Sequence, residues 1–290
     1  MPETVAPLGY LLPLGLLCLG LLVGSFLNVV IYRLPLMLES RWRRDCCELL
    51  EIEREVQETP LNLATPNSHC PQCKAAIRPW QNIPVLSYLL LRGKCANCAA
   101  PISLRYPSIE LVTGLMTLAL AWRFDLSPAL LGAVLLTWSL IALTMIDIDH
   151  QLLPDDITLP LLWLGLVFNL DATYVSLADA VIGAMAGYLI LWVVYQGFKL
   201  LTGKEGMGYG DFKLLGALGA WMGWQMLPEI ILLSSLVGAL CGIALMFIKR
   251  RGKDIPIPFG PYLAVAGWLA LLWGDGTYGS LFAHLGITLL

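Results

Sequence analysis

Charged side chains are scarce in this sequence: they make up 13% of its 290 residues, whereas 58% of the residues are hydrophobic. Soluble domains carry about 25% charged residues. The composition therefore excludes an ordinary soluble protein and indicates a polytopic membrane protein, in agreement with the mean hydropathy of +0.73. The net charge of −3 argues against a nucleic-acid partner, which would require a basic surface.

Other absences narrow the possibilities further. The first residues, Met1-Pro2-Glu3-Thr4, contain no Lys or Arg. A cleaved signal peptide needs a basic segment there, so we expect the first apolar run to be a retained span. The sequence also lacks a GxSxG serine elbow and an HExxH zinc-protease helix. Among the apolar segments only the one near the tail holds a histidine, His284.

Eight apolar runs have the length or the polar-ended character of membrane segments. They lie near residues 9–32, 107–122, 127–146, 157–170, 177–198, 212–226, 229–248 and 258–274. The sequence therefore predicts an all-α polytopic membrane protein, with about eight transmembrane helices and a small zinc-binding cytoplasmic insert. We expect residues 1–32 to form the first transmembrane helix, residues 33–106 the insert, and residues 107–290 the membrane core.

The lysines and arginines predict the orientation, because cytoplasmic loops are enriched in them. With the N-terminus outside and eight spans, every Lys and Arg except Arg123 falls on the cytoplasmic side. The same threading places Asp147 and the loop 206–211 on that side. The apolar tail, residues 281–290, is too short to span.

The insert contains two CxxC pairs, Cys70 with Cys73 and Cys95 with Cys98, each followed by an isoleucine at the same spacing. Two such turns supply four thiolates, which suit tetrahedral Zn²⁺. Two disulfides are the alternative, but the charge distribution places the insert in a reducing compartment. Four cysteines leave no open position, so the zinc is predicted to fold a loop that has little core.

The remaining cysteines lack a matching pair and are expected to be free, mostly buried thiols: Cys18, Cys46, Cys47 and Cys241. His69 is expected to be a surface histidine rather than a further ligand. The segment from Glu39 to Glu58 mixes acids, arginines and apolar residues in a pattern that suits a short amphipathic helix. A solvated helix face is the simpler interpretation of this segment, and docking of a basic peptide is the alternative.

A cluster of acids follows the third apolar run: Asp147, Asp149, Asp155 and Asp156. Asp147 is nearest to the run and is predicted to be the most desolvated. Asp149 points about 200° away on a helix, so we assign it a supporting role, with a solvated turn including His150 as the alternative. Asp155 or Asp156 is expected to cap the next helix.

Glycines at alternate positions precede an acid in the segment Gly206-Met207-Gly208-Tyr209-Gly210-Asp211. Glycine allows positive φ and close approach to another segment. A carboxylate at the mouth of a membrane segment is costly and is usually functional. We predict that Asp147 and Asp211 form a catalytic pair at the cytoplasmic edge, with Gly208 and Gly210 in support. An ion relay or a helix cap is the alternative for Asp211.

Two neighbouring aspartates can hydrolyse a peptide without a nucleophilic side chain or a metal. They cannot both ionise cheaply, so they share a proton. One then acts as a base toward water and the other as an acid toward the peptide carbonyl.

These motifs resemble a known family. Gly208-Tyr209-Gly210-Asp211 resembles the GxGD motif of intramembrane aspartic proteases. Asp147, followed by Leu153-Pro154-Asp155, resembles the first-aspartate motif of bacterial type IV prepilin peptidases. The four-cysteine loop resembles that of the bifunctional members. The further segments that match, over about residues 20–275, are 24–30, 33–35, 78–84 and 256–261.

The resemblance implies a multi-pass leader peptidase of the bacterial inner membrane, with its active site facing the cytoplasm. It would cut prepilins, and pseudopilins of type II secretion, after a leader-terminal glycine. It also implies N-methylation of the new N-terminal residue with S-adenosylmethionine as donor. Catalysis would fall to Asp147 and Asp211, and zinc binding to the four cysteines of the insert. No residues are assigned to the methyl donor, which we expect between the zinc loop and the membrane face.

In this picture the substrate helix lies among membrane lipids and its basic leader is drawn toward residues 48–58. The apolar segment 83–91 of the insert would rest on the membrane and cover the site. Two other functions would use the same features differently. A proton-coupled transporter would use the acids as a relay, and a non-enzymatic assembly scaffold would tolerate their replacement by asparagine.

Overall fold

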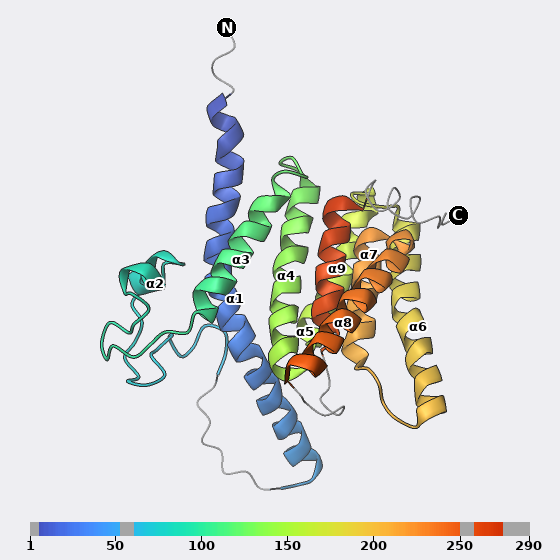
Figure 1. The fold of residues 1–290 in the computed structure, drawn as a ribbon, viewed down its shortest axis with the longest axis horizontal. Coiled ribbons are helices and arrows are strands. Elements are labelled where there is room, and N and C mark those ends of the chain that lie inside the picture. The colour runs from blue at the N-terminus through green and yellow to red at the C-terminus, as the bar shows by residue number, and fades with distance from the viewer. Residues whose placement is uncertain (1–5, 53–60, 250–257, 275–290) are drawn as a thin grey trace. The chain divides into compact units, whose positions relative to one another are not determined.

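The computed structural model describes residues 6–52, 61–249 and 258–274, and these residues are helical apart from turns and connecting segments. They contain no β-strand, and their β-type pairing is limited to two isolated bridges, His69 with Ala76 and Lys94 with Pro101. The chain divides into two compact units, Met1–Trp122 and Arg123–Leu290, whose elements are labelled in Figure 1.

The first unit contains α1 (Ala6–Leu49), a 3-10 turn η1 (Pro79–Asn82), α2 (Leu86–Leu90) and α3 (Arg105–Leu120). The second unit contains α4 (Pro128–His150), α5 (Asp155–Phe168), η2 (Asn169–Asp171), α6 (Leu177–Thr202), α7 (Tyr209–Met222), η3 (Trp224–Met226), α8 (Leu227–Lys249) and α9 (Gly260–Trp273). Each of the eight predicted apolar runs corresponds to one of these helices.

Four helices in the described ranges are long and apolar enough to cross a membrane: Leu11–Leu49, Pro128–His150, Leu177–Thr202 and Trp224–Ala244. The prediction of an all-helical membrane protein is therefore confirmed. The helix α9 is apolar but shorter, and eight spans remain a prediction.

The helices α1 and α3 pack closely because glycines line their contact. A Cβ on Gly24 would lie 2.7 Å from the Cα of Glu110, and one on Gly20 would lie 2.7 Å from Thr117 Oγ1. The hydroxyls of Thr113 and Thr117 donate to carbonyls one turn earlier in α3, so these buried polar groups are satisfied within their own helix.

The first helix does not end at the edge of the predicted span. It continues to Leu49, so the short amphipathic helix expected from Glu39 onward is wrong as a separate element. No glycine or proline lies between Pro35 and Leu49 to stop the helix. An ion pair between Arg43 and Glu39, one turn apart at 3.6 Å, is the kind of contact that supports such an extension. The last acids of that segment, Glu53, Glu55 and Glu58, lie outside the described residues.

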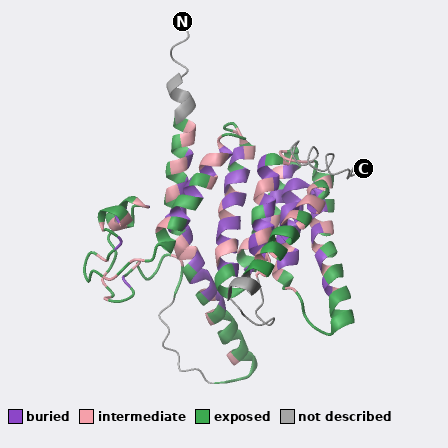
Figure 2. Ribbon diagram, viewed as in Figure 1, coloured by how far each residue is buried: buried purple, intermediate pink, exposed green. Residues whose placement is uncertain are grey.

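The second unit is built around α7. From Asp211 to Met222 every residue of this helix except Lys213 is buried, and α5, α6 and α9 pack against it. Buried residues run along the helices of this unit in Figure 2. The contact with α6 is made backbone to backbone, since a Cβ on Gly183 or Gly219 would overlap the other residue's carbonyl group.

The far end of α7 is held by side chains. Asn169, fully buried, donates from Nδ2 to the carbonyls of Ala220 and Trp221 at 2.9 and 3.1 Å. Its Oδ1 accepts the backbone N–H of Tyr174. The indole of Trp221 donates to the carbonyl of Leu161 at 2.8 Å. These bonds satisfy carbonyl groups that the end of a helix would otherwise leave unpaired. They also set the position of α7 along α5.

The four unmatched cysteines are free, as predicted, but they are not buried: Cys18 and Cys46 are exposed, and Cys47 and Cys241 are intermediate. Cys18 lies in the span candidate of α1, where lipid can solvate a thiol as well as a protein core can. The tail, residues 281–290, lies outside the described part of the chain.

Candidate active site and metal centre

Asp147 lies in the last turn of α4 and is 6% exposed. The helix ends three residues later at His150, and its C-cap residue Gln151 adopts a left-handed conformation with φ 52°. The Oδ2 atom of Asp147 accepts the backbone N–H of Gly260, the first residue of α9, at 3.1 Å. One carboxylate oxygen is therefore held by a fixed main-chain donor from a different helix.

Asp211 lies in the first turn of α7 and is 7% exposed. The helix begins after Gly208, an extended residue with φ −82° whose carbonyl accepts the N–H of Asp211 at 3.2 Å. The Oδ1 atom of Asp211 is buried and finds no hydrogen-bond partner among the described residues. An orphaned buried carboxyl oxygen is costly, which is typical of a functional group rather than a structural one.

The two aspartates share one neighbour, Leu153. A Cβ on Gly210 would lie 2.7 Å from the Cβ of Leu153, and a Cβ on Gly260 would lie 3.1 Å from its methyl groups. Leu153 thus touches both the residue before Asp211 and the residue that holds Asp147. The end of α4 and the starts of α7 and α9 therefore converge on one acidic site.

The glycines before Asp211 serve close approach and not positive φ. Gly206, Gly208 and Gly210 all avoid the positive-φ region, so that part of the prediction is wrong. Close approach is observed at Gly210 against Leu153 and at Gly206, where a Cβ would lie 2.8 Å from the ring of Phe198. Gly206 and Gly210 therefore remove bulk from a crowded turn, whereas a Cβ on Gly208 would meet no atom closer than 3.9 Å.

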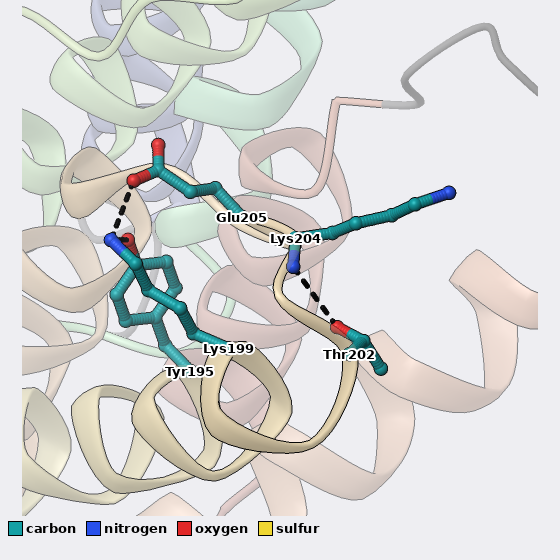
Figure 3. A network of polar contacts seen from close by, with 5 residues as sticks. All are labelled: Tyr195, Lys199, Thr202, Lys204 and Glu205. Carbon is teal, nitrogen blue, oxygen red and sulfur yellow. Dashed lines mark hydrogen bonds and ion pairs between the residues drawn. The ribbon is translucent and has the colours of Figure 1, made fainter.

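The loop between α6 and α7 is fixed by a polar and aromatic cluster (Figure 3). Lys199 donates to Glu205 at 2.7 Å and to the hydroxyl of Tyr195 at 3.4 Å. The hydrogen bond from Lys199 lowers the pKa of Glu205. The rings of Tyr209 and Phe212 stack against Tyr195 at 5.5 and 5.6 Å. The start of α7, and with it Asp211, is tied to the end of α6.

The other acids of the cluster are exposed, unlike Asp147. Asp149 is exposed, as expected from its position on the opposite side of the helix. The prediction that Asp155 or Asp156 caps α5 is wrong, since the N-cap residue is Pro154 and both acids lie in the first helical turn. Asp155 instead pairs with Lys213 of α7 at 2.7 Å. An acid in the first turn still interacts favourably with the helix dipole.

The four cysteine sulfurs of the insert all lie within 4.8 Å of one another. Cys70 Sγ is 3.8 Å from Cys98 Sγ, and Cys73 Sγ is 4.0 Å from Cys95 Sγ. Sulfurs about 2.3 Å from a tetrahedral zinc lie about 3.8 Å apart, so the arrangement fits Zn²⁺ and is too open for disulfides. His69 is exposed and its Nδ1 pairs with the carbonyl of Asn67.

Each half of the cluster is the same turn. In the first, the N–H of Cys70 donates to Ala75 and Lys74 donates back to Cys70; in the second, Cys95 donates to Ala100 and Ala99 donates back to Cys95. Lys74 and Ala99 share φ values of 58° and 57°. The sequence repeat is therefore a structural repeat.

Hydrogen bonds to sulfur favour the thiolate at Cys73 and Cys95. The side chain of Asn97 donates to Cys73 Sγ at 3.5 Å and lowers the pKa of that thiol to about 6. The backbone N–H groups of Cys98 and Asn97 lower the pKa of Cys95. Thiolates are the form that binds zinc.

Sequence reasoning assigned no role to several residues that shape these sites. Gly260 lies in the segment Pro256–Pro261, and a glycine between prolines is a pattern that could have drawn attention to it. Pro256 and Ile257 lie outside the described residues. Leu153 belongs to the Leu153-Pro154-Asp155 match, but no role was assigned to it. In the first unit, buried Glu110 of α3 accepts the N–H of Val85 at 2.7 Å and so fixes the start of α2.

The structure thus defines a helical membrane protein with a buried pair of aspartates and a four-cysteine cluster. Residues 18–124 match the sequence model of the Bacterial Peptidase A24 N-terminal domain, and residues 134–243 match that of the Type IV leader peptidase family. The prepilin leader peptidase/N-methyltransferase of Aeromonas hydrophila is 60% identical over 257 residues, which cover 88% of this chain and 89% of that protein.

Proteins of the same name are similar over the same region. The one from Pseudomonas aeruginosa is 57% identical over 257 residues, covering 89% of each chain. The one from Legionella pneumophila is 48% identical over 256 residues, covering 88% of this chain and 89% of its own. No solved structure matches the chain. This chain belongs to the type IV leader peptidase family.

Proposed function

We propose that this protein is a membrane aspartic endopeptidase that removes the basic leader of type IV prepilins and of type II secretion pseudopilins. It cuts after a glycine and then methylates the new N-terminal residue. The observation that carries the proposal is the convergence of Asp147 and Asp211, both buried, at the meeting point of three helix ends. Relatives that are 57% and 60% identical over most of the chain bear the name of this double activity.

In the proposed reaction the ionised aspartate removes a proton from a water molecule, whose oxygen attacks the carbonyl carbon of the leader's last residue. The protonated aspartate gives its proton to the carbonyl oxygen. The tetrahedral intermediate then breaks its C–N bond, and the amine leaves with a proton returned by the pair. Gly210 supports this step by allowing the turn before Asp211 to lie close to Leu153. Gly208 supports it as the residue after which α7 begins.

For the membrane topology we propose eight spans, with residues 1–32 as the first, residues 33–106 as a cytoplasmic zinc-binding insert and residues 107–290 as the protease core. The positive-inside distribution supports this orientation and puts the active site on the cytoplasmic side of the inner membrane. The apolar helix of a prepilin would lie in the lipid, and its leader would reach the acids from the cytoplasm.

We propose a structural zinc at Cys70, Cys73, Cys95 and Cys98. The donor set, its tetrahedral spacing and the N–H groups directed at two of the sulfurs support it. When bound, zinc would crosslink two turns that have little apolar core of their own.

S-adenosylmethionine is the proposed methyl donor, since the relatives are named as N-methyltransferases. The transfer moves a methyl group from the sulfonium of the donor to the free amine that cleavage exposes. We place this activity in the first unit, next to the zinc loop. A Cys70→Ser variant that methylates a pre-cleaved pilin at the normal rate would contradict this placement.

The test is to incubate the purified protein in lipid with a prepilin and S-adenosylmethionine and to analyse the product by mass spectrometry. We expect a product that has lost its leader and gained one methyl group. Asp147→Asn and Asp211→Asn should each lower kcat for cleavage by about 10³-fold or more, because a shared proton needs two carboxyl groups.

The matched control is Asp171→Asn, an exposed acid at the other end of α5, which should leave cleavage unchanged. Cleavage at the wild-type rate by either active-site variant would contradict the assignment of Asp147 and Asp211 as the catalytic pair. Proton-coupled transport in proteoliposomes without any proteolysis would favour the transporter alternative, which family membership already makes the weaker of the two.

A further inference from the structure

We propose that Gly260 is the positioning residue of Asp147, and that its backbone N–H fixes Asp147 as the proton acceptor of the pair. The inference rests on the proposed peptidase function and adds to it an assignment of roles. Both aspartates are buried, and Asp147 in addition receives a main-chain donor from a second helix.

The contact is made by the first residue of a helix. The N–H of Gly260 donates to Asp147 Oδ2 at 3.1 Å. Among the neighbouring donors, Pro261 has no N–H, and the N–H groups of Tyr262 and Leu263 donate to the carbonyl of Phe259. Gly260 therefore supplies the N–H that the start of α9 offers to the aspartate. The positive end of the helix dipole favours a negative charge at this position.

Only glycine fits this position. A Cβ on Gly260 would lie 2.6 Å from Asp147 Oδ2 and 3.1 Å from both methyl groups of Leu153. Any larger residue must displace the carboxylate or the helix. The helix cannot move freely, because the indole of Trp268, two turns further along α9, donates to Thr137 Oγ1 of α4 at 3.1 Å. The displacement would therefore fall on the carboxylate.

Asp211 has one buried oxygen that receives no donor from the described residues. Its Oδ1 is buried without a hydrogen-bond partner in the described part of the chain, whereas Oδ2 of Asp147 receives one. Hydrogen bonds to an ionised carboxylate stabilise it, and burial without such bonds destabilises it. The shared proton therefore resides on Asp211, which donates it to the peptide carbonyl, and Asp147 takes the proton from water.

The first experiment measures Gly260→Ala for prepilin cleavage in lipid. We expect kcat to fall about 100-fold, in the range of a displaced catalytic group, with KM within about twofold because no substrate contact is removed. The matched control is Gly267→Ala on the same helix, whose Cβ would first meet side-chain atoms of Leu218 and not a carboxylate of the site. Its kcat should stay within about threefold of the wild type. A kcat for Gly260→Ala equal to that of the control would overturn the inference.

A second measurement does not depend on activity. Gly260→Ala should lower Tm in the wild type by roughly 5 °C but by clearly less in an Asp147→Ala background, where only the contact of the new methyl group with Leu153 remains. Such non-additivity is the signature of two groups in contact. Equal losses of Tm in both backgrounds would contradict the contact.

Infrared difference spectra test the location of the proton. Asp211→Asn should remove the band of a protonated carboxyl group, and Asp147→Asn that of a carboxylate. The reverse result would refute the role assignment. If the wild type cleaves and both Asp→Asn variants do not, the proposed function stands, and wild-type kcat in Gly260→Ala then refutes the inference alone. If the wild type does not cleave, the proposed function fails, while the Tm comparison still tests the contact.

Discussion

The cysteine cluster and the aspartate pair place functional atoms by opposite means. The cysteines lie in two short turns, each closed by hydrogen bonds within a few residues, and are not all buried. The aspartates lie at the ends of α4 and α7, and both are buried by surrounding helices. Local turns can be stabilised by a metal where little core exists. A carboxyl pair needs a packed scaffold, because the scaffold holds the two like charges close enough to share a proton.

The two sites should therefore be sensitive to different changes. The cysteine cluster should fail when the metal is lost, even if the helices remain intact. The aspartate pair should fail when helix packing is disturbed, even at residues far from either acid. A change that disrupts one site should therefore leave the other intact.

The largest effect should come from Gly219→Ala, at the contact of α6 with α7. The new Cβ would overlap the backbone carbonyl of Gly183, which cannot rotate away as a side chain could. We expect a cost of about 3 kcal/mol and a fall in Tm of roughly 10 °C, with loss of cleavage. Thermal unfolding and prepilin cleavage measure both, and zinc content should stay unchanged.

The control for this change is Gly197→Ala, which lies on α6 and has no atom within 4 Å of its would-be Cβ. It should keep Tm and cleavage, or raise Tm slightly, since alanine favours a helix over glycine by up to about 1 kcal/mol. Equal behaviour of the two variants would show that the close contact between α6 and α7 is not what positions Asp211.

Loss of the metal should have an intermediate effect, confined to the insert. In Cys98→Ser, or after treatment with a strong chelator, we expect bound zinc to fall from one ion per chain to none and residues 61–104 to become sensitive to protease. Cleavage of prepilin should be retained in part. Elemental analysis and limited proteolysis measure these outcomes. Complete loss of cleavage with unchanged Tm would break the separation between the two sites.

The smallest effect should follow from Lys199→Gln, which removes the cation that holds Glu205. Exposed ion pairs contribute little, so we expect kcat to change by about two- to threefold. The hydrogen bond from Lys199 lowers the pKa of Glu205, so its contribution is complete above the ordinary pKa of a glutamate. It disappears as the pH falls through the lowered value.

Comparing the pH dependence of kcat in the wild type and in Lys199→Gln therefore tests the pH range in which this ion pair contributes. The two proteins should differ most near neutral pH and become alike in acid. A difference that grows as the pH falls would exclude this ion pair as the cause.

The sequence by itself determined the class of the protein, its helices and the cysteine cluster. Eight apolar runs predicted the positions of eight helices because burial in lipid or in a helical core demands long apolar segments. The repeated CxxC turn was predictable because each of its hydrogen bonds spans only a few residues. Both patterns involve residues that are close together in the sequence, so they can be recognised without the structure.

Only the tertiary structure decided how the acids are held. The sequence proposed Asp147 and Asp211, but it did not show that Gly260 donates to one of them or that Leu153 touches the turns beside both. It also misjudged the cap of α5, the exposure of Cys18 and the end of α1. These features depend on which helix surfaces face one another, and that choice is made by packing between residues distant in the chain.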